Sequence, residues 1–258
     1  MISHSIHKTI VVGLGVLAAV SISACSPAGV VGSFVSPSGC LAGPITFTVT
    51  DTSGSTSAER VRGGLYEEAE MAAAQQAAAE CGDLYATTAD GNSLSDSRWT
   101  IDDAQFRQAI GSEEVSRAAR VQAAKKLGRA IRRLMQEAPT AGTDVLGALT
   151  RVALAATVNH AGRKVQIVIQ TDGVLNVPGQ YNLYNVPIDT PGRRAAFVAR
   201  LESSSELPNL KGADVTLFGV GVGVGNRELA RSVVALWAEL VAHMNGRLVS
   251  LDAATPGV

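Results

Sequence analysis

The chain has 258 residues, with 22 Lys and Arg against 23 Asp and Glu, and a formal net charge of −1 at pH 7. A balance this close to neutral does not favour nucleic-acid binding, which usually requires a basic surface. Once an amino-terminal targeting segment is set aside, about 215 residues remain, enough for one α/β domain with a substantial core.

Residues 1–24 have the composition of an export signal. Lys8 precedes an apolar run over 9–20 that is as long as a signal-peptide core and too short to span a bilayer comfortably. The run leads into Ile22-Ser-Ala-Cys25, which resembles the lipobox of bacterial lipoproteins. The resemblance implies cleavage before Cys25 and acylation of its sulfur, and two acyl chains suffice for stable membrane attachment. The alternatives are a secreted protein cleaved nearby or an uncleaved anchor.

The sequence divides into four parts. After the signal over 1–24, residues 25–42 contain the lipidated cysteine and a tether rich in Gly, Ser and Pro. A folded domain is expected over 43–251, followed by a tail over 252–258. Loss of Lys8 with the signal leaves a net charge of −2, which still does not favour nucleic acid.

Cys40 and Cys81 remain as a candidate disulfide, because paired cysteines are common in exported proteins. Cys40 precedes the first predicted strand and Cys81 precedes the second, so both are expected at the amino-terminal edge of the sheet. Closing a loop of about 41 residues would stabilise the fold by about 4 kcal/mol through chain entropy. Neither cysteine has a CxxC partner or a nearby histidine, so a zinc site is not expected.

The first predicted strand covers 45–51, where apolar residues alternate with threonines at 46, 48 and 50. It ends at Asp51, and oxygen-bearing side chains follow at alternate positions, Ser53 and Ser55. Gly54 permits a tight turn, and a helix is expected to begin near 57–58. One carboxylate and two hydroxyls suit a small hard cation such as Mg²⁺. The alternative is a polar turn with a serine N-cap.

The next elements are a helix over 58–80, a strand over 83–88 and a short edge strand over 97–101. The glycine pair at 63–64 in that helix more often marks close backbone packing than chemistry. A long helix over 113–137 follows, with Val115, Leu127, Ile131 and Leu134 predicted to face the sheet. Its seven basic residues predict a solvated face, with a membrane-facing surface as the alternative.

The remaining chain alternates helices with strands. Helices are predicted over 141–156, 193–202 and 227–243, and strands over 164–170, 214–221 and 247–251, with an irregular polar stretch over 176–191. This alternation predicts an α/β fold with a doubly wound, mostly parallel central sheet and helices on both faces.

Three separated segments place polar residues at the end of a strand or the start of a helix. Asp51-x-Ser53-x-Ser55 follows the first strand, Gly142-Thr143-Asp144 opens a middle helix, and Thr171-Asp172-Gly173 ends a hydrophobic strand. Together they resemble the von Willebrand factor type A (VWA) domain with its metal-ion-dependent adhesion site, over roughly 43–251. The threonines at 46, 48 and 50 depart from the more apolar strand of that family, which leaves the burial of the strand's second face open.

The resemblance implies that Mg²⁺ or Mn²⁺ binds at five residues. Ser53 and Ser55 would bind it directly, Asp51 and Asp172 directly or through water, and Thr143 in either way according to conformational state. It also implies a protein partner whose acidic residue completes the coordination. The sequence therefore predicts a non-enzymatic, lipid-anchored binding module on the extracytoplasmic face of the cell membrane.

A scaffold domain with a vestigial metal site is one alternative function, and two further alternatives fit the sequence less well. A metal-dependent hydrolase would need a positioned base or nucleophile, but His160 and His243 are expected away from the site and no Gly-x-Ser-x-Gly motif occurs. Dinucleotide binding at Gly219, Gly221, Gly223 and Gly225 is disfavoured because Val224 occupies the place of the third glycine of GxGxxG.

Overall fold

The computed structural model describes one folded unit. The chain divides into residues 1–34 and 35–258, and all described residues belong to the second part. They are 43–57, 61–91, 99, 101–105, 141–159, 162–177 and 179–253, with helical positions at 118, 122, 127, 128, 130–133 and 135 and the adjoining turn residue 136. The predicted signal, Cys25, the tether, Cys40 and residues 254–258 lie outside these ranges.

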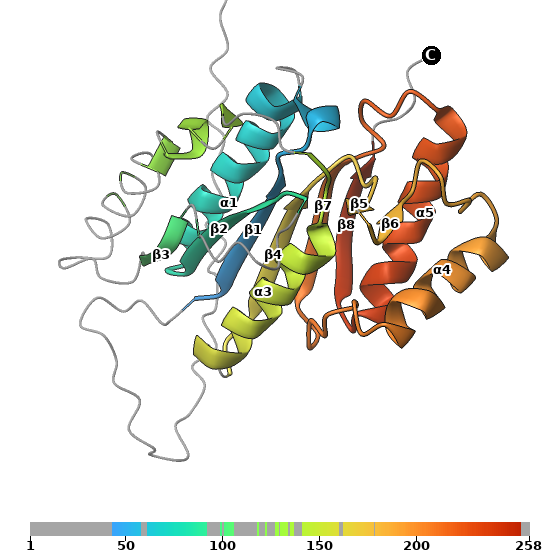
Figure 1. Cartoon of the computed structure of the whole chain (residues 1–258). Helices are drawn as coiled ribbons and strands as arrows, with labels where there is room; N and C mark the ends of the chain where they lie inside the picture. The colour runs from blue at the N-terminus through green and yellow to red at the C-terminus, as the bar shows by residue number, and fades with distance from the viewer. Residues whose placement is uncertain are drawn as a thin grey trace, which may run out of the picture. The chain divides into compact units, whose positions relative to one another are not determined.

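A six-stranded sheet forms the centre of the fold, in the order β3-β2-β1-β4-β7-β8 (Figure 1). The strands are β1 (Ile45–Asp51), β2 (Asp83–Ala89), β3 (Ile101–Gln105), β4 (Val165–Gln170), β7 (Asp214–Val220) and β8 (Arg247–Ala253). Five of them run parallel, and only β3, at the edge, pairs antiparallel with β2. The predicted doubly wound, mostly parallel α/β sheet is confirmed.

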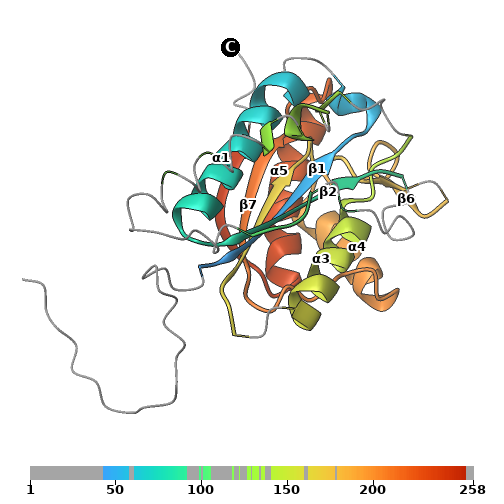
Figure 2. The same cartoon turned by 90° about the vertical axis from the view of Figure 1, so that its left-hand side faces the viewer.

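Helices cover both faces of this sheet (Figures 1 and 2). They are α1 (Glu67–Ala79), α3 (Val145–Asn159), α4 (Pro191–Ser203) and α5 (Arg227–His243), and a π-helical segment, η2 (Val61–Tyr66), precedes α1. Phe47 belongs to the apolar cluster that includes residues of α3, whereas the next residue, Thr48, contacts Glu70 of α1. Because side chains alternate along a strand, α1 and α3 lie on opposite faces of β1.

The threonine face of β1 is buried, which answers the question that the sequence left open. All seven residues of β1 are buried, and the threonines face polar partners instead of apolar ones. Thr46 donates to Gln166 Oε1 (3.2 Å), and Thr50 donates to Gln170 Oε1 (2.9 Å). Thr48 donates to Glu70 Oε1 (2.6 Å), while Gln170 Nε2 donates to Glu70 Oε2 (2.7 Å). Mutual hydrogen bonding makes this buried polar layer compatible with the core.

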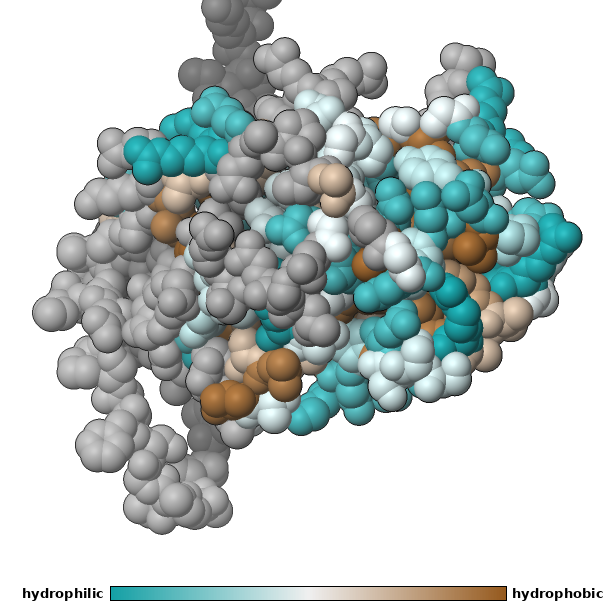
Figure 3. Space-filling model, viewed as in Figure 1, coloured by the Kyte–Doolittle hydropathy of each residue, from teal (hydrophilic) through white to brown (hydrophobic). Residues whose placement is uncertain are grey.

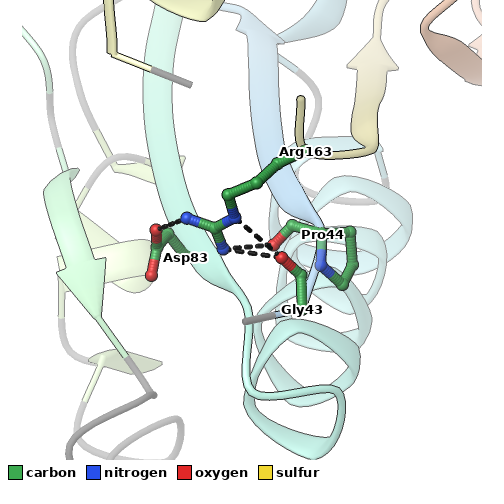
Figure 4. A network of polar contacts seen from close by, with 4 residues as sticks. All are labelled: Gly43, Pro44, Asp83 and Arg163. Carbon is green, nitrogen blue, oxygen red and sulfur yellow. Dashed lines mark hydrogen bonds and ion pairs between the residues drawn. The ribbon is translucent and has the colours of Figure 1, made fainter. Parts of the chain in front are cut away.

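Arg163 links the segment that enters β1 to the start of β2, at the amino-terminal edge of the sheet (Figure 4). Its Nε and Nη2 donate to the carbonyl of Gly43 (2.9 and 2.6 Å), and Nη2 also donates to that of Pro44 (3.3 Å). Its Nη1 pairs with the carboxylate of Asp83, which is fully buried. Nearby, the Gly43 amide donates to the carbonyl of Cys81 (3.1 Å).

Cys81 is disulfide-bonded and lies directly before β2, at the edge that the sequence predicted. Its expected partner Cys40 is not among the described residues, so the pairing of these two cysteines stays a prediction.

One expectation is wrong in detail, and a second is contradicted at one of its two residues. The edge strand was predicted over 97–101, but β3 covers Ile101–Gln105 and Trp99 is not in a strand, while residues 97, 98 and 100 lie outside the described residues. Trp99 instead packs near Phe47 and Tyr85, with ring centroids 5.9 and 5.7 Å away.

The glycine pair at 63–64 falls in the π-helical segment, and a Cβ at Gly64 would meet nothing within 4 Å. Close packing therefore does not explain Gly64.

The other elements match their predictions within a few residues, and the polar stretch over 176–191 contains a small hairpin of β5 (Asn176–Val177) and β6 (Tyr181–Asn182). Of the predicted helix over 113–137, the described positions from 118 to 135 are helical. There Ile131 is buried, Leu127 is partly buried, and Arg132 and Arg133 are exposed, while Val115 and Leu134 lie outside the described residues.

No helix among the described residues is both long enough and apolar enough to cross a membrane. Figure 3 shows apolar surface over the lower end of α3, where Leu154 and Val158 are exposed.

Candidate metal site

Asp51 accepts a hydrogen bond at each carboxylate oxygen, one from the loop after β1 and one from the end of β4. The Ser53 amide donates to Oδ1 (2.9 Å), and the Thr171 hydroxyl donates to Oδ2 (2.8 Å). The Thr56 hydroxyl closes the turn by donating to the carbonyls of Asp51 (2.9 Å) and Ser53 (3.0 Å). Asp51 is fully buried, so its position is fixed by the loop and by the neighbouring strand end.

Asp172 lies at the end of β4, the strand beside β1. Its Oδ1 accepts a hydrogen bond from the Val174 amide (2.8 Å), and its carbonyl accepts one from the Gly221 amide (2.8 Å). Gly173 follows with φ +84°, and a Cβ there would lie 2.9 Å from Trp237 Nε1, whose N–H donates to the Gly173 carbonyl (3.0 Å). Glycine is required at this turn both by its backbone conformation and by this close contact.

One oxygen of Asp172 has an unusual environment. Asp172 is fully buried, and its Oδ2 accepts no hydrogen bond from the described residues. A buried carboxylate oxygen without a donor is unfavourable unless a cation or an ordered water satisfies it.

The two serines lie beside these carboxylates. The hydroxyls of Ser53 and Ser55 are 3.1 Å apart, and the Ser55 hydroxyl also interacts with the Asp172 carboxyl group. Ser53 is buried, whereas Ser55 is exposed. The serine pair therefore lies between the buried carboxylates and solvent.

Thr143 comes from the loop before α3, at the same carboxyl edge of the sheet. Its amide and carbonyl both pair with Asn176, four residues beyond Asp172, at 2.6 and 3.1 Å. Thr143 is itself buried. The next residue, Asp144, has a different role, because its Oδ1 accepts from the Gly147 amide (2.8 Å) and so caps the start of α3.

The two buried carboxyl groups influence each other. The pKa of Asp51 is raised by burial and then by the charge of Asp172, against the opposing effect of its hydrogen bonds to Ser53 and Thr171. The pKa of Asp172 is also raised by burial, partly offset by Ser55 and the Val174 amide. Neither carboxylate forms an ion pair with a basic side chain of the described residues. A bound divalent cation would relieve both the burial penalty and the mutual repulsion.

The donor set fits such a cation. Among the described residues, no group of three or more His, Cys, Asp and Glu side chains could hold a metal ion. The site instead combines two carboxylates with hydroxyl groups, and hard oxygen donors of this kind suit Mg²⁺ or Mn²⁺.

Sequence reasoning missed two side chains of this site, Thr171 and Tyr184. Thr171 had been seen only as part of the strand end, although its hydroxyl orients Asp51. The Tyr184 hydroxyl interacts with Ser55, and the pKa of Tyr184 is raised by burial and by the charges of Asp172 and Asp51. Tyr184 belongs to the stretch predicted as irregular, and no sequence pattern there connects it with the loop after β1.

The fold and this edge of the sheet define an α/β domain with a doubly wound sheet and an oxygen-rich site at its carboxyl end. No protein-family model and no curated protein matches the chain. Among solved structures, it is similar to the pilus adhesin SpaC from Lactobacillus rhamnosus GG in its open conformation, with 13% sequence identity and a TM-score of 0.46. The alignment covers 83% of this chain and 28% of the adhesin. We therefore base the functional proposal on the residues of the site.

Proposed function

We propose that this chain is a VWA-type binding module that engages a protein partner through Mg²⁺ or Mn²⁺. The observation that carries the proposal is the buried Oδ2 of Asp172, which has no hydrogen-bond donor among the described residues and lies next to Asp51 and the serine pair. In the proposal, Asp51, Ser53, Ser55, Thr143 and Asp172 hold the cation.

The hydrogen bonds of the site support different roles for its two carboxylates. Both oxygens of Asp51 already accept a protein hydrogen bond, which favours contact with the ion through water. Oδ2 of Asp172 has no such donor among the described residues, which favours a role closer to the ion. With Ser53 and Ser55 as neutral ligands, the cation keeps much of its charge and attracts an acidic residue of the partner.

The proposal is of binding without catalysis. His243 is the one histidine among the described residues. It lies in the last turn of α5 and pairs with Glu202 of α4 (2.7 Å). That turn leads into β8 at the amino-terminal edge of the sheet, away from the site. In the proposal, acylated Cys25 anchors the protein to the extracytoplasmic face of the cell membrane.

A comparison of partner capture with and without chelator tests the proposed function. Wild-type protein should retain a partner from membrane extracts in Mg²⁺ and release it in EDTA, whereas Ser53→Ala should capture none in either condition. Ser57→Ala is the matched control, because Ser57 lies on the same loop, is exposed and bonds only the Gly54 carbonyl (2.6 Å) among the described residues. Capture that is equal in EDTA and in Ser53→Ala would contradict a metal-dependent function.

A further inference from the structure

A groove of about 480 Å³ lies between the loop that follows β6 and the start of α5. One wall is the loop that follows β6, with Tyr184, Val186, Pro187 and Asp189 among its lining residues. The other wall is the first turn of α5, which contributes Glu228 and Leu229. In Figure 1 this turn lies near the edge of the sheet where β7 ends.

Tyr184 joins the groove to the metal site. It lines the groove, it is 53% exposed, and its hydroxyl interacts with Ser55. The turn that carries it is held by Asn182, whose Oδ1 accepts from the Tyr184 amide (2.9 Å) and whose carbonyl accepts from the Asn185 amide (2.9 Å). A peptide bound at the metal would therefore pass Tyr184 as it enters the groove.

The groove combines a few apolar residues, such as Val186, Pro187 and Leu229, with polar groups and negative charge. Its lining includes two carboxylates, Asp189 and Glu228, and no Lys or Arg. Asp189 is paired with Arg193 (2.6 Å), which does not line the groove. Glu228 is exposed and forms no ion pair with another described residue. Arg227 and Arg231 flank it on α5 but are not part of the lining.

These features match a long basic side chain. The methylene stem of Lys or Arg packs well against apolar side chains and an aromatic ring while its charged head remains near solvent. The carboxylate of Glu228 would then pair with that head. An acidic side chain would be repelled, and an apolar one would leave Glu228 without a partner.

We propose that this groove binds a basic side chain of the partner, close in sequence to the acidic residue that completes the metal site. The inference rests on the proposed function and extends it, because the partner would be recognised by an acidic and a basic residue together.

Four amidated, N-acetylated peptides test the groove in NMR titrations of the purified protein in Mg²⁺ and in EDTA. They carry Glu-Lys, Glu-Gly-Lys, Glu-Leu or Gln-Lys between pairs of glycines. In Mg²⁺, the tighter of the two Glu/Lys peptides should bind about threefold better than Glu-Leu, as expected for one exposed charge pair. Gln-Lys should bind weakest, because it cannot complete the metal site.

Glu228→Gln should remove the preference for Lys over Leu and leave Glu-Leu binding unchanged. Glu202→Gln is the control. Glu202 lies at the end of α4 and does not line the groove, so this variant should keep the preference for Lys over Leu. Mg²⁺-dependent binding with no preference for Lys, or a preference that Glu228→Gln does not alter, would overturn the groove and leave the metal site standing. Binding of every peptide that is equal in EDTA would overturn the metal-dependent function, and the groove proposal with it.

Discussion

Glu70 places a carboxyl group in the interior of the domain, on the threonine face of β1. It is fully buried, and its oxygens accept from Thr48 and Gln170. Burial raises the pKa of Glu70 to about 7, and the two hydrogen bonds only partly oppose this shift. Near neutral pH, the native state therefore holds a proton that the unfolded chain releases at an ordinary glutamate pKa of 4.5.

This shift makes stability depend on pH. Because the folded pKa exceeds the unfolded one, the contribution of Glu70 is complete below about pH 4.5 and is lost as pH rises to about 7. Glu70→Gln keeps the shape without the ionisation, so its free energy of unfolding relative to wild type should rise by about 3 kcal/mol between pH 4.5 and pH 8. Urea unfolding of both proteins at several pH values measures this difference. A difference that does not change with pH would contradict the account of Glu70.

The residues of the site show what a sequence can and cannot predict at this scale. Asp51, Ser53, Ser55 and Asp172 are close together, as their spacing after adjacent strands suggests. Glu70 was not predicted as a buried acid, since it occurs in a helix rich in Glu and Gln. The repeated threonines of β1 were its signal, because a buried polar face requires polar partners.

Among the elements, α3 begins directly after Asp144, a residue that the sequence had grouped with the metal motif. Asp144 caps α3 through the Gly147 amide, and its own amide donates to the Asp90 carbonyl (2.7 Å). The cap fixes the start of α3 and so the loop that carries Thr143.

Asp144→Ala should lower the free energy of unfolding by about 1 kcal/mol, the usual cost of losing such a cap. Asp144→Asn retains a cap acceptor and should lower it by much less. Thermal or urea unfolding of the two variants decides between a capping role and a role for the charge. Equal losses in both variants would favour the charge.

Long elements with strong periodicity were predicted well, and short or irregular ones were not. β1, β2, β4 and β7 are largely buried parallel strands whose β-branched residues are visible in the sequence, whereas β8 is a parallel edge strand with Val249 exposed. β3 is an edge strand with polar residues, so its hydrophobic pattern is weak and its position was missed. The π-helical segment before α1 was also missed, because its altered hydrogen bonding leaves no distinct signature in composition.

At the scale of the whole molecule, the amino-terminal and carboxyl edges of the sheet carry different features. The chain enters β1 at the amino-terminal edge, where Arg163 and Cys81 fasten it, while the candidate ligands lie at the carboxyl edge. The point where the described chain enters the domain therefore lies at the opposite edge of the sheet from the candidate ligands.

The proposed lipid anchor can be tested by fractionation. Cys25→Ala would remove the proposed acylation site, so the variant should either leave the membrane fraction or keep its signal uncleaved. Ser26→Ala, one residue further on, should stay in the membrane fraction at its mature size. Cys25→Ala protein that sediments with membranes at the mature size would contradict lipid anchoring.

The most direct test of the central claim is a titration of the purified protein with Mn²⁺, followed by electron paramagnetic resonance. Wild type should bind one Mn²⁺ per chain in competition with Mg²⁺, and the Glu-Lys peptide and the ion should each raise the affinity of the other by the same factor. Asp172→Ala and Ser53→Ala should lower Mn²⁺ affinity by about tenfold or more, while Ser57→Ala should not. Unchanged Mn²⁺ binding in Asp172→Ala, or no saturable binding in wild type, would contradict a metal site at this edge of the sheet.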